Sequence, residues 1–117
     1  MKDFRNLKVW EKSHQLALEV YRCSVNFPKE EMFGLTSQVR RAGSSIPANI
    51  AEGCGRGGEA DFARFLQIAM GSASELEYHI LLAHDLGYLD GSAYQTLNAH
   101  IVEVKKMLAS LIGAIRK

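Results

Sequence analysis

Residues 94–115 read YQTLNAHIVEVKKMLASLIGAI, and this stretch decides the fold. Its apolar side chains recur at alternating steps of three and four residues, at Tyr94, Leu97, Ile101, Val104, Leu108, Leu111 and Ile115. This alternation places them on one face of an α-helix and is typical of a seam between packed helices. Ser92 and Gln95 have the spacing of a capping box. We therefore predict a helix that is opened by Asp90-Gly91-Ser92 and continues to residue 115.

Three further stretches have the same helical period. A helix over residues 59–86 is predicted, with Gly87 as its C-terminal cap. A helix over about 35–54 begins where Thr36 can cap the first turn. A first helix runs from about residue 7 to residue 26 and stops before Pro28, because proline disfavours the helical conformation of the residue before it. The predicted core positions of the second and third helices are Leu35, Val39, Ala42, Ile46 and Ile50, and Phe62, Leu66, Ala69, Ala73, Leu76, Ile80 and Ala83.

Four helices of this length with short connections predict an all-α fold, an antiparallel up-and-down four-helix bundle. Pro47 lies inside the second helix, where it removes one backbone donor, so we expect this helix to be kinked near residues 43–45. The 117 residues leave room for one domain only, over residues 1–117.

The first helix carries two adjacent apolar stripes, Trp10, His14, Ala17, Tyr21 and Val25 on one and Val9, Leu16, Val20, Cys23 and Phe27 on the other. Together they make an apolar face wider than one core contact requires. A lone bundle would leave part of this face exposed, so we expect a homo-oligomer.

The composition is that of an ordinary globular protein, with 47% hydrophobic and 23% charged residues. The first residues lack the apolar segment of a signal peptide, and no uncharged run approaches the ~20 residues that span a bilayer. Cys23 and Cys54 form no disulfide framework and are predicted to be small apolar fillers. We expect a cytoplasmic protein that has no membrane partner.

The net charge is only +1, but the charges are unevenly distributed along the chain. Residues 1–41 carry +3, residues 42–91 carry −5 and residues 92–117 carry +3. If the fold brings the two ends of the chain together, one rim of the molecule is basic. The alternative is an ordinary alternation of surface charge between helices.

No catalytic or metal-binding constellation emerges, and we predict no catalytic residue, metal or cofactor. Glu11 and His14 have the Glu-x-x-His spacing of di-iron bundles, but such sites need a second copy and further carboxylates. His79 and His84 are five residues apart, which turns them away from a common helix face. The glycine-rich segment 53–58 precedes a helix but lacks the lysine of a P-loop, so a flexible connection is favoured over an anion cradle.

A polar stripe follows one side of the second helix: Gln38, Arg41, Ser45, Asn49, Glu52 and Arg56. It flanks the apolar face of this helix, so we expect Arg41 and Arg56 to form partly buried pairs with Glu52 and with Glu75 of the third helix. A solvated helix side with incidental charge pairs is the alternative. Glycines inside helices cost about 1 kcal/mol relative to alanine, so Gly43 and Gly71 predict a close approach of the second and third helices.

The segment from Gln38 to Gly53, QVRRAGSSIPANIAEG, resembles the four-helix-bundle family of proteins encoded in intervening sequences of bacterial 23S rRNA genes. The resemblance begins with Leu7-Lys8-Val9-Trp10 and Phe27-Pro28. It continues through Phe62, Phe65-Leu66, Ala69, Gly71-Ser72-Ala73 and Glu75-Leu76-Glu77-Tyr78, and so covers most of the chain.

The resemblance implies an up-and-down bundle that assembles into a homopentameric ring and has no established enzymatic activity. It also implies association with RNA or a ribonucleoprotein. By analogy of fold alone, the family is similar to the accessory protein of diversity-generating retroelements, a basic barrel whose partner is a reverse transcriptase. The net charge of +1 departs from that basic barrel.

We therefore favour a non-enzymatic oligomer that binds RNA or a ribonucleoprotein through basic surface patches. The candidate contacts for nucleic acid are Lys8, Lys12, Arg40, Lys105, Lys106, Arg116 and Lys117, with Lys2, Arg5 and Arg41 beside them. The alternative is a structural adaptor that binds another protein through its apolar face, without nucleic acid.

Overall fold

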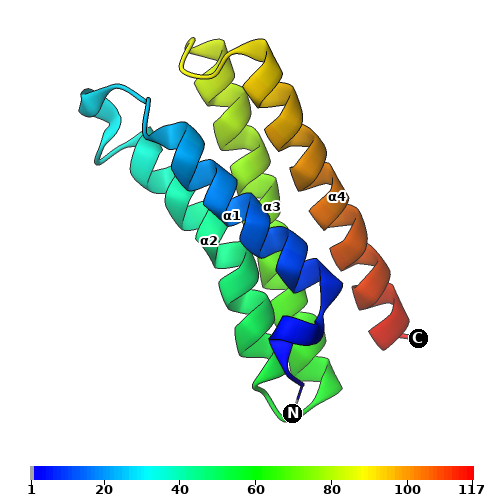
Figure 1. Ribbon diagram of the computed structural model, residues 1–117. Coiled ribbons are helices and arrows are strands. Elements are labelled where there is room, and N and C mark those ends of the chain that lie inside the picture. Colours follow the sequence, from blue (N-terminus) through cyan, green and yellow to red (C-terminus); the bar gives the residue numbers. More distant parts are fainter. Residues whose placement is uncertain (1) are drawn as a thin grey trace.

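The computed structural model describes residues 2–117, and within them the protein is all helical (Figure 1). Four long helices carry the fold, and short 3₁₀ helices precede α1 and α2. In chain order the elements are η1 (Phe4–Asn6), α1 (Lys8–Ser24), η2 (Lys29–Glu31), α2 (Leu35–Cys54), α3 (Glu59–Asp85) and α4 (Gly91–Ile115).

Successive helices run in opposite directions, which confirms the predicted up-and-down four-helix bundle (Figure 1). α1 contacts α2 and α4, and α3 contacts the same two helices, so the four helices form a closed square. The bundle measures 43 × 23 × 20 Å. Both chain ends and the α2–α3 connection lie at one end of the bundle, which we call the terminal end; the α1–α2 and α3–α4 connections lie at the other (Figure 1).

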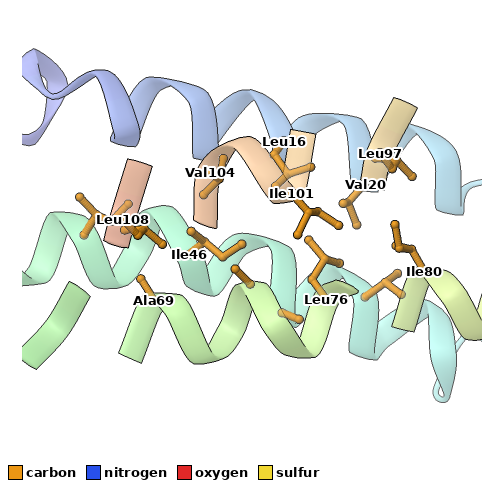
Figure 2. Packing of buried hydrophobic residues seen from close by; sticks show 14 of the residues in the cluster. Leu16, Val20, Ile46, Ala69, Leu76, Ile80, Leu97, Ile101, Val104 and Leu108 are labelled. Atoms are coloured by element: carbon orange, nitrogen blue, oxygen red, sulfur yellow. The ribbon is translucent and has the colours of Figure 1, made fainter. Parts of the chain in front are cut away.

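The predicted stripes meet in a single core between the four helices (Figure 2). Every predicted core position of α2 and α3 is buried. The largest fully buried side chains come from all four helices: Leu16, Ile46, Ile50, Leu66, Leu76, Ile80, Leu97, Ile101 and Leu108. Of the two stripes of α1, one enters this core, while Tyr21 and Val25 of the other stay exposed.

The turn between α3 and α4 confirms one predicted cap and corrects another. Gly87 has a φ of 83°, and the Tyr88 N–H donates to the Ala83 carbonyl at 2.8 Å, which closes the end of α3. At the start of α4, however, the capping side chain is Asp90 and not Ser92. Its carboxylate accepts the Ala93 N–H at 2.7 Å.

The start of α2 is capped by Glu31, and the expectation that Thr36 does so was wrong. One oxygen of the Glu31 carboxylate accepts the Leu35 N–H at 3.1 Å, and the other accepts the Tyr88 hydroxyl at 3.0 Å. A single side chain therefore ties the α1–α2 connection to the α3–α4 connection. Thr36 is buried instead.

The close contact between α2 and α3 is made by a different glycine from those predicted. A Cβ on Gly43 would lie 3.5 Å from Val20 of α1, and one on Gly71 would meet nothing within 4 Å. A Cβ on Gly53 would lie only 2.8 Å from the Cβ of Phe65 and 3.1 Å from Phe62. The helices thus approach most closely near the terminal end. α2 continues unbroken through Pro47, and a kink there stays a prediction.

We predict that Gly53→Ala destabilises the bundle by about 1–3 kcal/mol, because the added methyl group forces Phe65 or α2 to move. Gly113→Ala is the matched control, since Gly113 also lies in a helix and has open space around it. The control should leave the free energy of unfolding unchanged or slightly raise it. Equal denaturant midpoints for the two variants would contradict the close contact at Gly53.

We also predict a pH-dependent contribution from Tyr88. The hydrogen bond to Glu31 raises the pKa of the Tyr88 phenol above its ordinary value. A raised pKa in the folded state means that the contribution is fully present below pH ~10 and is lost as the pH rises through the folded-state pKa. Tyr88→Phe should lower the melting temperature at pH 8, and this difference from wild type should shrink at pH 11 and above.

Candidate functional site

Two of the seven predicted nucleic-acid contacts are engaged in ion pairs between helices. Lys12 of α1 lies 3.7 Å from Glu103 of α4, and Lys105 of α4 lies 2.8 Å from Glu77 of α3. In both pairs the carboxylate largely offsets the positive charge. These two lysines therefore join neighbouring helices and contribute little free charge to a ligand.

Arg40 lies away from the other candidates, at the end of the bundle opposite the termini. Its Nε donates to the Ser24 hydroxyl at 2.8 Å, and its guanidinium lies 5.0 Å from the ring centroid of Tyr21. Arg40 of α2 thus binds the end of α1 from the side. These contacts give Arg40 a structural role, in which it holds the end of α1 against α2.

The other four candidates, Lys8, Lys106, Arg116 and Lys117, make no ion pair within residues 2–117, and all lie at the terminal end. Lys8 and Lys106 line the same groove between the start of α1 and the end of α4, about 500 Å³ in volume. The remaining lining is mostly apolar: Leu7, Val9, Met107, Leu111 and Ala114, with Ser110. The structure therefore brings together unpaired cations that are about a hundred residues apart in sequence.

The charge of the whole bundle is polarised along its length. The segments at the terminal end, residues 2–12, 52–64 and 103–117, carry ten basic and six acidic side chains, a net charge of +4. The remaining residues carry four basic and seven acidic side chains, a net charge of −3. Because the chain ends come together, the basic rim expected from the sequence forms at this end.

The polar stripe forms the expected ion pairs, but they are not buried. Arg41 lies 3.6 Å from Glu75 of α3, and the two side chains are 70% and 42% exposed. Arg56 lies 3.7 Å from Glu52, and both are also largely exposed. The large cost expected for breaking a buried pair therefore does not apply, and these are surface pairs.

Other members of the stripe make local contacts. Asn49 donates its side-chain N–H to the Ser45 carbonyl at 2.8 Å, one turn earlier in the same helix. Gln38 is exposed. Within this stripe, the ion pair of Arg41 with Glu75 therefore joins the middle of α2 to α3. The other ion pairs of the stripe lie at the connection between the two helices.

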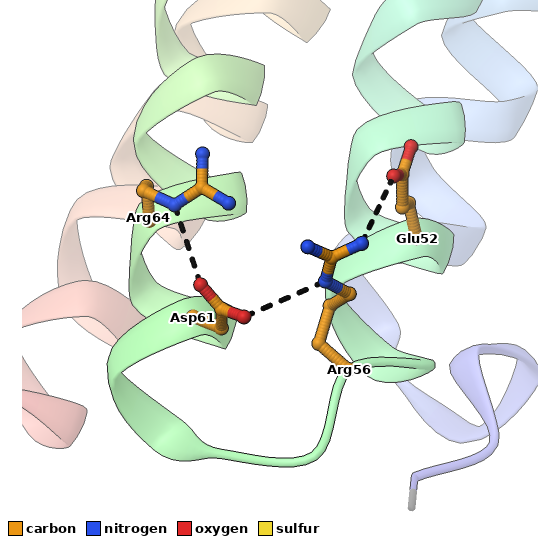
Figure 3. Close-up of polar contacts among 4 residues, drawn as sticks. All are labelled: Glu52, Arg56, Asp61 and Arg64. Carbon is orange, nitrogen blue, oxygen red and sulfur yellow. Dashed lines mark hydrogen bonds and ion pairs between the residues drawn. The ribbon is translucent and has the colours of Figure 1, made fainter.

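Ion pairs span the connection between α2 and α3 (Figure 3). Arg56 lies between Glu52 and Asp61, at 3.7 and 3.5 Å, and Asp61 also lies 3.3 Å from Arg64. A cavity of about 70 Å³ beside Gly57 and Gly58 is lined by Lys2 and Arg56, but the Arg56 charge already faces two carboxylates. The pairs therefore support a structural role for this glycine-rich segment.

The chemistry of the remaining reactive side chains is limited. Burial raises the pKa of the Cys54 and Cys23 thiols above the ordinary value, which keeps them protonated at neutral pH. Among residues 2–117, no group of three or more His, Cys, Asp or Glu side chains is arranged to hold a metal ion. Nor does any helix in this range have the length and apolarity needed to cross a membrane.

Exposed apolar side chains form a feature that the helical pattern of the sequence did not single out. Phe33 is 98% exposed and Tyr78 is 58% exposed. Phe33 lies in the α1–α2 connection, where no helical period applies, and Tyr78 lies outside the core stripe of α3. One signal in the sequence could have revealed the exposed side chains. Met32 and Phe33 follow two glutamates in the segment between the first two predicted helices, so neither belongs to a predicted core stripe.

Comparisons with known proteins agree with the fold. The sequence profile of the 23S rRNA-intervening sequence protein family matches residues 5–110. A crystal structure of a protein with unknown function from the S23 ribosomal protein family of Bacteroides thetaiotaomicron VPI-5482 superposes with a TM-score of 0.83. The two sequences are 32% identical over 90% of this chain and 95% of the other. A search of curated proteins gives no match.

We predict that the two neighbouring arginines of α2 differ in their effect on stability. Arg40→Ala removes two hydrogen bonds and a contact with an aromatic ring, and should cost about 1–2 kcal/mol. Arg41→Ala, the matched control, breaks an exposed pair and should cost less than about 1 kcal/mol. Chemical denaturation measures the free energy of unfolding of both variants. A larger loss for Arg41→Ala than for Arg40→Ala would contradict this ranking and would indicate that Arg41 makes a stabilising contact with another molecule.

Proposed function

The chain belongs to the 23S rRNA-intervening sequence protein family, and from this premise we propose that it is a non-enzymatic homo-oligomer that associates with RNA or a ribonucleoprotein. The solved relative is a protein of unknown function, so the proposal rests on the surface of this chain. Its main support is the terminal end, where Lys8 and Lys106 lie across one groove without acidic partners. Lys2, beside the α2–α3 connection, and Arg116 and Lys117, at the end of α4, add positive charge to the same end of the bundle.

Unpaired lysines and arginines are the groups that bind a phosphate backbone, because they release counterions from it without first losing an internal partner. The end carries +4 although the chain carries +1. Residues 2–117 form no sheet that could carry the exposed aromatic residues of an RNA-recognition motif, so we expect binding that tolerates different sequences.

Assembly would make such a modest patch effective. Each further copy that engages the same nucleic acid binds at a high effective concentration, so several weak patches give one strong association. The family resemblance implies five copies, and light scattering should then give a mass near five times 13.0 kDa. Five such ends would present a positive surface that one chain lacks.

A test compares two double variants that remove the same charge. Lys8→Gln/Lys106→Gln neutralises the groove, while Lys12→Gln/Lys105→Gln, the control, neutralises two lysines whose charges already face Glu103 and Glu77. The first should weaken binding to a single-stranded RNA and flatten the dependence of log affinity on log salt, by about 0.7 per chain for each lysine that no longer meets a phosphate. The control should leave the slope unchanged. Equal slopes for both variants would place the binding surface elsewhere.

A second candidate function is an adaptor that binds another protein without nucleic acid. The exposed Leu18 and Tyr21 of α1, and Val25 directly after it, favour this function. Capture of the protein from its native host, with nuclease treatment before or after capture, distinguishes the two functions. RNA-mediated partners disappear from the treated sample, whereas partners bound directly to an apolar face remain.

A further inference from the structure

We propose that the occupant of the exposed apolar surface is a second copy of this chain, bound through two different faces. One copy contributes the corner where α1 meets the α1–α2 connection, and its neighbour contributes the outer side of α3. The proposal rests on the homo-oligomer proposed above and names the surfaces that build it. Neither surface includes the basic terminal end.

The first surface, the apolar corner, is formed by side chains from the last turns of α1 and from the connection that follows: Leu18, Tyr21, Val25, Met32 and Phe33. Phe33 is 98% and Val25 70% exposed. Tyr21, Met32 and Phe33 line one open hollow of about 410 Å³. A phenylalanine fully exposed beside other apolar side chains is a large apolar surface for a protein to leave in water.

The second surface, the α3 seam, follows the outside of the third helix. Its positions recur at steps of three and four, Ile68, Gly71, Glu75, Tyr78 and Leu82, which is the spacing of a helix that packs against another element. Ile68 and Tyr78 are exposed, and Leu82 is half-buried. Ile68, Gly71 and Tyr78 lie outside the core stripe of α3, and Leu82 at the end of the seam packs against the edge of the core.

Gly71 lies in the middle of the α3 seam, and the isolated chain does not explain it. A Cβ at this position would meet nothing within 4 Å, so packing inside the bundle does not require glycine. Glycine in an exposed helix interior costs about 1 kcal/mol relative to alanine. Close approach of a neighbouring chain offsets this cost, because only glycine leaves the backbone of α3 open between Ile68 and Tyr78.

The charges beside the two surfaces have opposite signs. Arg22 borders the apolar corner and Asp85 borders the α3 seam, and neither makes an ion pair in the described part of the chain. Arg40 and Arg41 line the hollow of the corner, and the charged side chains around it carry a net charge of +2: Arg22, Lys29, Glu30, Glu31, Arg40 and Arg41. The corner and the upper part of the seam also lie at the same end of the bundle, away from the termini (Figure 1). Chains standing side by side in the same direction can therefore join corner to seam.

The contact is heterologous, since each chain uses one surface towards one neighbour and the other surface towards the next. Such a contact repeats until a ring closes. Removing either surface on every chain should abolish the assembly. The exposed positions allow this to be tested without disturbing the core.

The first test compares Gly71→Gln with Gly113→Gln. Both glycines lie in helices and have open space around them, so neither change should lower the stability of the isolated bundle. Gly71→Gln should reduce the mass measured by light scattering to that of one chain, while Gly113→Gln keeps the oligomer. An unchanged mass for Gly71→Gln would overturn the assignment of the seam.

The second test mixes two defective variants. Val25→Ser/Phe33→Ser lacks the corner but keeps the seam, and Gly71→Gln/Tyr78→Ser lacks the seam but keeps the corner. Each alone should be a monomer; mixed in equal amounts they should form a one-to-one dimer and nothing larger, because each pair retains one intact contact. A larger assembly, or no dimer, would overturn the heterologous pairing.

The measured masses distinguish the existence of the oligomer from the identity of its contact surfaces. If the wild-type protein is a monomer at every concentration, the proposed oligomer itself is wrong. If the wild type is an oligomer and both double variants keep its mass, the oligomer stands and the corner and seam are not its contacts.

Discussion

Burial of one continuous apolar core by four helices is the constraint from which the rest of the structure follows. Each large side chain taken fully out of water contributes about 1.5–3 kcal/mol, and residues such as Leu16, Ile46, Leu76 and Leu108 supply this from four different helices. Ion pairs at the surface, such as Arg41 with Glu75, are worth less than about 1 kcal/mol. The core therefore sets the rotation of every helix, and the charged side chains lie where that rotation leaves them.

This hierarchy explains which features could be predicted from the sequence. Helical period depends on the core, so the stripes of α2 and α3 and the approximate limits of all four helices were predictable. Caps depend on a single hydrogen bond and several residues compete for it. Asp90 and Glu31 make the capping hydrogen bonds that were expected of Ser92 and Thr36. The contact of Glu31 with Tyr88 joins residues that are 57 positions apart, so no local sequence pattern reveals it.

The candidate site was less predictable because it depends on partners from other helices. A list of lysines and arginines does not show which of them face a carboxylate. Lys105 and Lys106 are neighbours in sequence, yet one pairs with Glu77 and the other lines an open groove. The same holds for the glycines: Gly53 is fixed by the rings of α3, while Gly71 has no neighbour, and both look alike in the sequence.

The polarity of the bundle and the proposed assembly constrain each other. Rotation about a ring axis moves every chain without inverting it, so in a ring built from one heterologous contact all equivalent ends stay at the same height. The +4 end of each chain then lies on one side of the ring and the −3 end on the other. A dimer with a two-fold axis across the bundles would instead set basic ends against acidic ones and cancel the field. A chain with almost no net charge presents a strongly positive surface only through an assembly that keeps its copies aligned, and a corner-to-seam contact has that property.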